Sequence, residues 1–212
     1  MPFIVFEGLD GSGKSSLMSA LEVELTGKQL PVVRTREPGG TELGDEIRNL
    51  ILRQQGQAPT ARTELLLYEA SRAQHVDLVI KPALDRNVWV LCDRYSASSV
   101  AFQAGGREIS ELWVEKLNDF ATNGVLPDLT VLLDLSVEES RRRRTQRNSQ
   151  GGSQEDRIES ETDSFHERVR RSFLDQAKRA PQKWLILDAA LSQEALKVKT
   201  LEYLRGLRWL EV

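Results

Sequence analysis

One short segment combines glycines, a lysine and hydroxyl side chains at a spacing that suits phosphate binding. It fits the pattern G-x-x-x-x-G-K-[ST] at every fixed position. We predict that the phosphates of ATP or GTP bind to Gly8, Leu9, Asp10, Gly11, Ser12, Gly13, Lys14, Ser15 and Ser16. Glycines let backbone N–H groups turn toward a polyphosphate, Lys14 adds a catalytic positive charge, and the Ser15 hydroxyl can bind Mg²⁺. The alternative is a Gly/Ser-rich turn that contains a lysine by chance.

The segments on either side of this glycine loop (residues 8–15) fit a strand and a helix. Phe3–Glu7 is short and apolar, as in a buried strand. After the loop, Leu17, Leu21 and Leu25 recur every four residues, as on one face of a helix. Strand, loop and helix in this order place the positive end of the helix against the phosphates. The context therefore favours a nucleotide site over an ordinary turn.

Two further polar clusters follow predicted strands. Arg36-Glu37-Pro38-Gly39-Gly40 begins where the strand Val32–Arg36 ends, and Asp93-Arg94-Tyr95 begins at the end of the strand Val88–Asp93. An aspartate at such a position can hold Mg²⁺ through water, and an arginine can bind phosphate with two N–H groups. Because the carboxyl ends of parallel strands meet at one edge of a sheet, we expect both clusters to lie beside the glycine loop.

Strand-like and helix-like patterns alternate along the whole chain, which predicts an α/β fold. The strands are rich in Val, Ile and Leu without alternating polarity, as in a parallel sheet covered by helices on both faces. The predicted strands are Phe3–Glu7, Val32–Arg36, Val88–Asp93, Leu129–Leu135 and Trp184–Asp188. The predicted helices cover about 14–27, 42–55, 63–85, 109–123, 137–146, 156–180 and 192–206. No linker interrupts this pattern, so we predict a single domain over residues 1–212.

The composition argues against several classes of protein. With a net charge of −3, the chain has no overall basic field that would indicate a nucleic-acid partner. No stretch approaches the ~20 apolar residues that a membrane-spanning helix needs. A single cysteine suits a reducing compartment, and the first residues lack the basic segment of a signal peptide. We therefore expect a cytoplasmic protein without a membrane or nucleic-acid partner.

Taken together, the motifs resemble the bacterial type of the thymidylate (dTMP) kinase family. The resemblance covers Phe3 to about Ala190. Besides the glycine loop it rests on Thr35-Arg36-Glu37-Pro38-Gly39-Gly40-Thr41, Ser71-Arg72-Ala73-Gln74-His75, Asp93-Arg94-Tyr95, Ser98-Ser99 with Phe102-Gln103, and Pro127-Asp128-Leu129-Thr130. It implies a three-layer α/β/α P-loop nucleoside monophosphate kinase fold, with a five-stranded parallel sheet in the order 2-3-1-4-5 and a lid. It also implies phosphoryl transfer from ATP to dTMP, with Mg²⁺, in a homodimer formed through helix 63–85.

The resemblance also implies which residues hold the acceptor. Tyr68 would stack on the thymine ring, while Arg72 and Gln103 would bind the edge of the base. Arg48 and Arg94 would hold the monophosphate, and Arg94 would also act catalytically. The remaining residues implied at this site are Asp10, which would meet the 3′-hydroxyl, and Arg36, Glu37, Pro38, Ser98, Ser99, Phe102, Asp156 and Glu159. The metal would lie at Ser15 and Asp93.

Two positions depart from the family's pattern. Phe102 stands where the family commonly has a tyrosine that crowds a ribose 2′-hydroxyl. Phenylalanine keeps the steric block but cannot make the tyrosine's hydrogen bond. Ala97 stands where the family often has an aspartate.

Several of these residues also have an ordinary structural interpretation. Tyr68 follows three leucines and could belong to the core, and Arg48 could be a solvated helix residue. Arg72 lies four residues after Tyr68, on the same helix face, but could instead pair with Glu69 or Glu64. We assign no role to the chain's two histidines, because neither has the spacing of a metal ligand.

Arg141-Arg142-Arg143-Arg144, with Arg147, forms the most basic part of the chain. The run contains no interleaved aromatic residues and is balanced by acids at 155–163, so a solvated helix face fits it better than nucleic-acid binding. It leads into the segment 148–154, whose Gly, Ser, Asn and Gln are typical of a flexible tip.

The glycine loop itself carries no cation at Gly11 or Ser12. The resemblance implies that a mobile lid at about 137–160 supplies this charge instead. We therefore predict Arg147 as a catalytic residue of the lid, with Arg143 as the second candidate.

The implied reaction is an in-line transfer that needs no general base, because the acceptor monophosphate has a second pKa near ~6 and is largely deprotonated at neutral pH. The alternatives are a deoxynucleoside kinase, a regulatory GTPase and a nucleotide-binding module without catalysis. A deoxynucleoside kinase needs a carboxylate base, and that family has a Glu-Arg-Ser sequence at the end of the third strand, where this chain has Asp93-Arg94-Tyr95. A regulatory GTPase needs an Asn-Lys-x-Asp sequence to bind guanine, and the chain lacks one. The third is disfavoured because Lys14, Ser15 and Arg94 are intact.

Overall fold

The computed structural model of the chain describes residues 1–149 and 155–211. Strands and helices alternate along most of it, as predicted. In chain order they are β1 (Phe3–Glu7), α1 (Lys14–Gly27), β2 (Val32–Arg36), α2 (Glu42–Leu52), α3 (Ala61–His75), η1 (Val76–Ile80), α4 (Lys81–Asp85), β3 (Trp89–Asp93), α5 (Ser96–Ser99), η2 (Val100–Gly106), α6 (Glu111–Thr122), β4 (Leu129–Asp134), α7 (Val137–Ser149), α8 (Asp163–Arg179), η3 (Pro181–Lys183), β5 (Trp184–Asp188) and α9 (Gln193–Gly206). Most of the predicted flexible tip, residues 150–154, lies outside the described residues.

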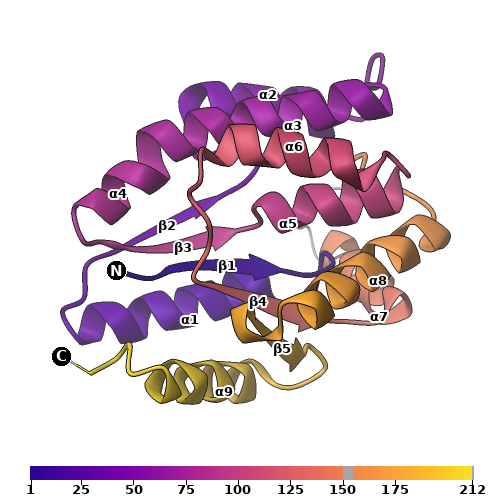
Figure 1. Cartoon of the computed structure of the whole chain (residues 1–212). Helices are drawn as coiled ribbons and strands as arrows, with labels where there is room; N and C mark the ends of the chain where they lie inside the picture. The colour runs from indigo at the N-terminus through magenta and orange to yellow at the C-terminus, as the bar shows by residue number, and fades with distance from the viewer. Residues whose placement is uncertain (150–154, 212) are drawn as a thin grey trace.

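In the described part of the chain, five parallel strands form one sheet in the order β2-β3-β1-β4-β5 (Figure 1). The central strand is β1, in which Val5 is level with Cys92 of β3 on one side and with Thr130 of β4 on the other. The predicted strand order is therefore confirmed. The glycine loop leaves the end of β1, so it emerges between the ends of β3 and β4, at the middle of the sheet's carboxyl edge.

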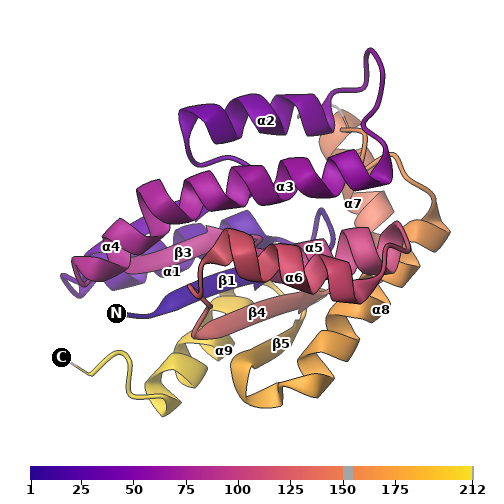
Figure 2. The same ribbon diagram turned by 45° about the horizontal axis from the view of Figure 1, so that its top comes forward.

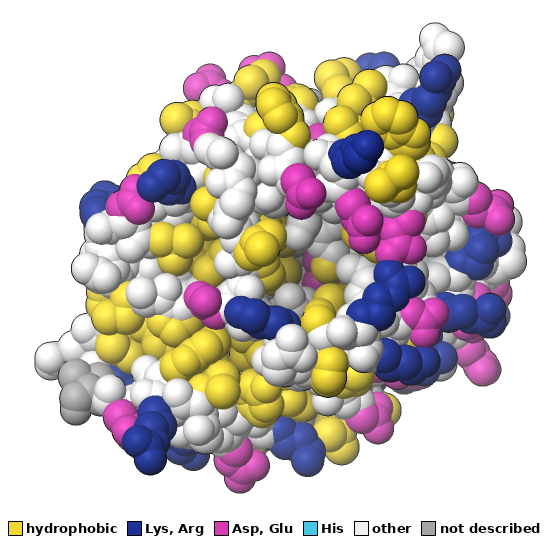
Figure 3. All heavy atoms as spheres, in the orientation of Figure 1, with side chains coloured by type: hydrophobic (Ala, Val, Ile, Leu, Met, Phe, Trp, Pro, Cys, Tyr) yellow, Lys and Arg dark blue, Asp and Glu magenta, His cyan; other side chains and the backbone are white. Residues whose placement is uncertain are grey.

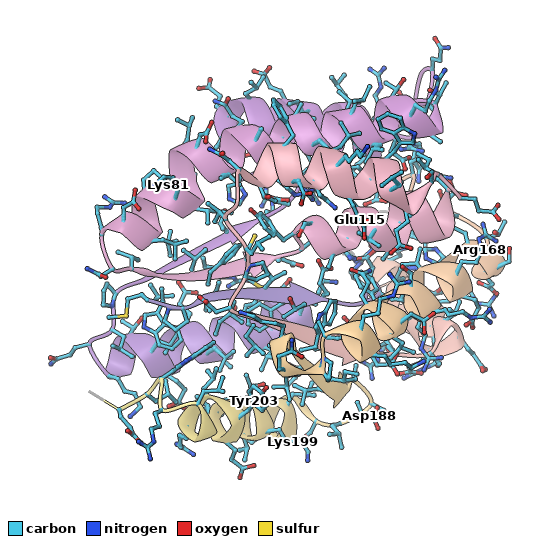
Figure 4. The ribbon with its side chains drawn as sticks, in the orientation of Figure 1. Lys81, Glu115, Arg168, Asp188, Lys199 and Tyr203 are labelled. Atoms are coloured by element: carbon cyan, nitrogen blue, oxygen red, sulfur yellow. The ribbon has the colours of Figure 1, made fainter. Side chains whose placement is uncertain are left out.

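Helices cover both faces of the sheet and complete the predicted three layers. Views from two directions show α1 and α9 on one face, and α3, α4 and α6 on the other (Figures 1 and 2). In Figure 4, Tyr203 on α9 and Glu115 on α6 mark these two outer layers. The side chains of β1 alternate between them: Ile4 and Phe6 pack in the apolar cluster of α1 and α9, while Phe3 and Val5 pack in the cluster of η1 and α4. Burial on both faces explains why the strands show no alternating polarity.

Two predicted helices differ strongly from the observed ones, while the ends of the others shift by at most three residues. The predicted helix 63–85 runs instead as α3, a π-helical segment η1 and α4, end to end from residue 61 to 85. The predicted helix 156–180 begins only at Asp163, because the Thr162 side chain caps α8 by accepting a hydrogen bond from the Phe165 backbone N–H at 3.3 Å. Turns occupy residues 157–160.

The segment from α5 to η2 was not predicted. Its sequence, SASSVAFQAGG, is rich in serine and glycine, which have little intrinsic preference for helix. Burial supplies the missing stability, since Ser98, Ser99, Phe102 and Gln103 are all buried and η2 packs against α8. This segment brings Phe102 and Gln103 to the sheet edge. Among the helices described, we find none that combines the length and apolar character needed to cross a membrane.

Candidate active site

The glycine loop joins β1 to α1 at the centre of the sheet edge. Gly8 has a φ of 133°, and a Cβ atom there would lie 2.4 Å from the Leu133 carbonyl oxygen, so only glycine fits. Gly13, with a φ of 96°, directly precedes α1, whose first residue is Lys14. The first N–H groups of α1 therefore face the loop, an arrangement that favours an anion.

Lys14 is buried, and its ammonium group rests on the loop itself. Its Nζ donates hydrogen bonds to the carbonyl oxygens of Gly8 at 3.1 Å and Leu9 at 3.3 Å, and lies 3.7 Å from Asp10 Oδ1. Ser12 Oγ is buried and has no hydrogen-bond partner among the residues described. The loop thus presents a positive charge and an unpartnered hydroxyl where phosphate oxygens would lie.

Ser15 and Asp93 meet across the gap between α1 and β3. The Ser15 hydroxyl donates to Asp93 Oδ2 at 3.3 Å, and Asp93 Oδ1 is buried without a partner in the described structure. A hydroxyl and a carboxylate oxygen are ligands that Mg²⁺ accepts, and this ion normally takes one or two protein ligands together with water and substrate phosphates. The pair fits that ion, and no cluster of three or more His, Cys, Asp or Glu suited to a metal occurs within 1–149 and 155–211.

A cavity of about 470 Å³, partly open to solvent, lies next to the glycine loop. It collects side chains from the loop, the turn after β2, α2, α3, the end of β3, η2 and the turn before α8. Its lining consists of Asp10, Glu37, Pro38, Arg48, Leu52, Tyr68, Arg94, Ser98, Phe102, Gln103, Asp156 and Ile158. Most of the predicted acceptor residues therefore share one cavity, and Tyr68 lies on its wall rather than in the apolar core.

Arg94 lines the cavity and also contacts the glycine loop through Asp10. It follows β3 in a left-handed conformation, with a φ of 68°, which side chains other than glycine rarely adopt. Its Nη2 donates to Asp10 Oδ1 at 2.9 Å, and its guanidinium carbon lies 4.9 Å from the centre of the Phe102 ring. Burial raises the pKa of Asp10, but the charges of Arg94 and Lys14 outweigh it and hold this pKa well below its usual range. Asp10 is therefore an ionised hydrogen-bond acceptor at neutral pH.

Glu7 is a site residue that the sequence analysis missed. It is fully buried at the end of β1, where Oε1 accepts from the Tyr95 N–H at 3.0 Å and Oε2 from the Ser98 hydroxyl at 2.7 Å. Burial raises the pKa of Glu7 to about 7, against the opposing charge of Arg94. The only available signal was an acidic residue that closes an otherwise apolar strand. Its contacts show that it fixes the backbone after β3, where Arg94 lies.

Arg72 lies behind the cavity wall, in a buried network of polar side chains. Its Nε donates to Glu37 Oε2 at 2.8 Å, and its Nη1 donates to Glu69, Ser99 and Asn118. The contact with Glu69 is one of the two structural alternatives that the sequence offered for Arg72. Glu64 instead accepts from Gln103 and also from two arginines, 107 and 157. The Nη2 of Arg72 donates to no atom of the described residues, although the side chain is only 1% exposed and does not line the cavity.

Four of the predicted acceptor residues do not line the cavity: Arg36, Arg72, Ser99 and Glu159. Arg36 is exposed, donates to Asp45 Oδ1 at 3.0 Å and lines a neighbouring hollow that also includes Ser15 and Asp93. Arg48 does line the cavity, and its Nη1 donates to the Pro38 carbonyl at 3.2 Å. Arg48 therefore ties α2 to the turn after β2.

The two lid arginines have different partners. Arg143 donates to the Gly11 carbonyl at 3.2 Å and to the Ala189 carbonyl at 3.0 Å, so it holds the outside of the glycine loop. Arg147 donates to Glu159 Oε2 at 2.7 Å, and Glu159 does not line the cavity. Both residues lie on α7, which reaches the loop through the Ser140 hydroxyl, a donor to the Asp10 carbonyl at 2.7 Å.

Other members of the basic run have separate roles. Arg141 and Arg142 are exposed and pair with Asp163 and Glu139, as expected of a solvated helix face. Arg144 is buried, donates to Ser140 Oγ at 3.4 Å and lies 3.3 Å from Glu155 Oε1. A solvated helix face was expected here, and Arg144 departs from that expectation because it packs inside the molecule.

Comparison with known proteins points to one family. The model of the thymidylate kinase family matches residues 6–199. A thymidylate kinase of Bdellovibrio bacteriovorus is 65% identical over 96% of this chain and 95% of its own length. Thymidylate kinases of Clavibacter michiganensis and an Exiguobacterium species are 47% and 43% identical, over 92% and 95% of this chain and 90% and 92% of their own lengths. With its glycine loop, its cavity and these relatives, the chain belongs to the thymidylate kinase family.

Proposed function

We propose that this chain transfers the γ-phosphoryl group of ATP to dTMP and so forms dTDP. The observation that carries this proposal is the meeting of two sites at Asp10, which belongs to the glycine loop and also lines the cavity. Lys14 Nζ lies 3.7 Å from one oxygen of that carboxylate, and Arg94 Nη2 lies 2.9 Å from the same oxygen. A donor on the loop and an acceptor in the cavity would thus bring their phosphates together beside two cations. Phosphoryl transfer requires this approach of two polyanions.

The base-reading side of the cavity suits thymine. Gln103 donates its Nε2 to Glu64 at 3.0 Å, which leaves its carbonyl oxygen to accept the N3–H of thymine. The free Nη2 of Arg72 can donate to the carbonyl at C4, and the Tyr68 ring offers a stacking surface. Cytosine has an acceptor at N3 and an amine at C4, so it mismatches both contacts. An acceptor on Gln103 beside a donor on Arg72 matches a pyrimidine with an N3–H and a carbonyl at C4, which supports thymine as the base.

The phosphate side of the cavity supplies charge rather than a base. Arg48 and Arg94 would hold the acceptor monophosphate, whose attacking oxygen is already largely deprotonated. Lys14 and the lid arginines 143 and 147 would stabilise charge on the transferring group. Mg²⁺ at Ser15 and Asp93 would offset charge on the ATP phosphates when bound. Arg147 would have to exchange Glu159 for a phosphate oxygen as the lid closes over the substrates.

Phe102 would separate deoxyribose from ribose. Its ring lies over the Arg94 guanidinium and is held from behind by Phe165 and Phe173, with ring centres 6.2 and 6.1 Å away. A ring fixed on both sides cannot move aside for an additional hydroxyl group. We therefore propose that Phe102 disfavours a 2′-hydroxyl by steric contact alone.

A homodimer in the cytoplasm completes the proposal. Large apolar side chains on α3, η1 and α6 are exposed, namely Leu66, Leu78, Leu112, Trp113 and Phe120. Figure 3 shows groups of hydrophobic side chains over these helices, in its upper part. Exposed apolar patches of this kind mark protein interfaces, which supports pairing through α3. The single cysteine is a buried free thiol, which suits the reducing cytoplasm.

The rival reaction, phosphorylation of a nucleoside 5′-hydroxyl, needs a base beside the glycine loop, and neither Asp10 nor Glu7 suits that role. Asp10 has a strongly lowered pKa, so it accepts a proton poorly. Glu7 has a pKa of about 7, but it is fully buried and both of its oxygens already accept hydrogen bonds from Tyr95 and Ser98. A monophosphate acceptor needs no such base.

A coupled assay of ADP release across dTMP, dUMP, CMP, AMP and thymidine tests the proposal. We expect dTMP to react best and dUMP less well, because a missing methyl group costs only ~1–3 kcal/mol in a hydrophobic pocket. CMP, AMP and thymidine should react negligibly. Faster turnover of CMP or AMP than of dTMP would refute the assigned acceptor, and faster turnover of thymidine would favour the nucleoside kinase.

A further inference from the structure

His75 has no part in the proposed reaction, yet it is completely buried at the end of α3. Its Nδ1 lies 2.9 Å from Glu37 Oε1, and its Nε2 lies 2.6 Å from Thr35 Oγ1. A carboxylate oxygen accepts hydrogen bonds, so we assign the hydrogen of this contact to Nδ1. The hydroxyl of Thr35 can adapt, because it can either donate or accept. The donor role of Nδ1 toward Glu37 is therefore fixed, whereas the role of Nε2 toward Thr35 can change.

The loop after β2 is shaped around the imidazole. A Cβ atom on Gly40 would lie 2.7 Å from His75 Nε2, so the ring occupies the space that this glycine leaves empty. The N–H of Gly39 donates to the Ser71 hydroxyl on the preceding turn of α3, at 3.1 Å. The loop is thus docked on one face of α3, through two fully buried residues, Ser71 and His75. The helix widens into the π-helical segment η1 directly after His75, a feature that is rare and often found beside functional sites.

Glu37 connects His75 to the base-reading arginine. One carboxylate oxygen accepts from His75 and the other accepts from Arg72 Nε at 2.8 Å. Two contacts on opposite oxygens fix the plane of the carboxylate. Together with the contacts that Nη1 makes to other side chains, this plane orients the Arg72 guanidinium. The same Glu37 side chain lines the acceptor cavity. A change at His75 is therefore passed on to both the cavity wall and the free Nη2 of Arg72.

We propose that His75 is a positioning residue for base recognition, acting through Glu37 on Arg72. The proposal rests on the proposed function, because it needs Arg72 to face the pyrimidine. Two consequences distinguish this positioning role from that of a histidine that only fills space. Without the Nδ1 donor, the preference for dTMP over dCMP falls, because Arg72 no longer presents Nη2 in one direction. The KM for ATP stays unchanged, because the glycine loop is anchored elsewhere.

Two variants of similar polarity separate the donor from the bulk of the ring. In His75→Asn the amide nitrogen takes the place of Nδ1 and can still donate to Glu37. In His75→Gln the longer amide reaches toward Thr35 instead. We expect His75→Gln to lower the ratio of kcat/KM for dTMP to that for dCMP about tenfold and to raise the KM for dTMP, the effect of losing one hydrogen bond to a charged group. We expect His75→Asn to stay within about threefold of the wild-type ratio.

The measurements are steady-state kinetics with both nucleotides and a thermal melt of each variant. Equal ratios in the two variants, or a wild-type ratio in His75→Gln, would overturn the proposal and leave His75 as packing. If neither variant folds, Glu37→Gln tests the same connection with His75 in place, and an unchanged ratio there also overturns it. A wild-type enzyme that does not phosphorylate dTMP refutes the proposed function itself, so the two failures are distinct.

Discussion

At the scale of single residues, the charge of Lys14 is held in place by its own loop rather than by an acidic partner in the core. Its Nζ contacts two loop carbonyls at 3.1 and 3.3 Å. We expect Lys14→Met to keep the fold, because methionine fills the same space, and to reduce kcat below about a tenth of wild type by removing charge from the transferring phosphate. A kinetic assay with a thermal melt checks both points. Lys28→Met, at an exposed lysine just after α1, is the matched control and should be silent.

A second prediction at this scale concerns Arg147, one of the two lid arginines. Arg147→Ala should lower kcat at least ~10²-fold, somewhat less than the ~10³–10⁵ that an arginine finger supplies. The KM for dTMP should change little, because Arg48 and Arg94 hold the acceptor. Arg141→Ala is the control, since its pairing with Asp163 is exposed to solvent and contributes little.

Arg143→Ala should behave differently from both. It donates to the Gly11 and Ala189 carbonyls, so its loss should raise the KM for ATP as well as lower kcat. Measurement of kcat and both KM values distinguishes the variants. If Arg143 and Arg147 behave like Arg141, the lid is only a cover and the cation comes from elsewhere.

Glu7 makes the folded state sensitive to pH. Its pKa rises from 4.5 to about 7 on burial, so the folded protein binds this proton more tightly than the unfolded chain does. The stabilisation is complete below pH 4.5 and is lost as the pH rises through 7. Relative to Glu7→Gln, which has no charge to titrate, the wild-type free energy of unfolding should fall by about 3 kcal/mol across that range. Urea unfolding at several pH values measures this, and parallel curves for the two proteins would contradict it.

Residue types and spacing predicted that the glycine loop and the two polar clusters lie at one sheet edge. The residues around the acceptor came from resemblance, and neither source predicted which of them reach the cavity. Arg72 and Tyr68 lie on the same helix, and only Tyr68 lines the cavity. Arg72 lies deeper because Glu37, Glu69 and Asn118 surround it, and these come from three separate elements. Glu69 follows from local spacing on the helix, but the contacts with Glu37 and Asn118 depend on tertiary packing, which local spacing does not contain.

At the scale of elements, the strands were predictable and the helix ends were less so. Three of the five predicted strands have the observed bounds, because a short apolar run flanked by polar residues is unambiguous. The segment Ser96–Gly106 escaped prediction because its helical form depends on packing against α8, not on its own serines and glycines. Phe102 and Gln103 could therefore be assigned only by resemblance, although the loop residues followed from their own pattern.

The start of α8 is the element that backs Phe102, through Phe165. Thr162 caps it by accepting from the Phe165 N–H at 3.3 Å. We expect Thr162→Ala to reduce the free energy of unfolding by ~1 kcal/mol, the usual cost of losing a cap. Urea denaturation measures the change. Thr145→Ala, at an exposed position inside α7, is the matched control and should not destabilise, because alanine favours the helix interior. Equal losses in the two variants would argue against the cap.

At the scale of the whole molecule, the apolar face of α3 and α6 should decide the oligomeric state. Phe120 is 83% exposed on α6. We expect Phe120→Asp to convert a dimer into a monomer, because it places a charge in an apolar interface. Light scattering after size-exclusion chromatography measures the mass. Val23→Asp is the matched control, because Val23 is 71% exposed but lies on α1, across the sheet. A wild-type protein with the mass of one chain would contradict the proposed dimer.

The pairing of β3 with both of its neighbours limits how the length of the chain can vary. Asp93 is level with Phe6 of β1 and Arg36 of β2. One residue inserted into β3 would move Asp93 along the strand by ~3.3 Å and turn it to the opposite face. It would also part Asp93 from Ser15, without replacing any residue of the site. The exposed segment 53–60, between α2 and α3, carries no such constraint. Insertions and deletions among relatives should therefore fall in segments like this one, and the length of β3 should stay constant.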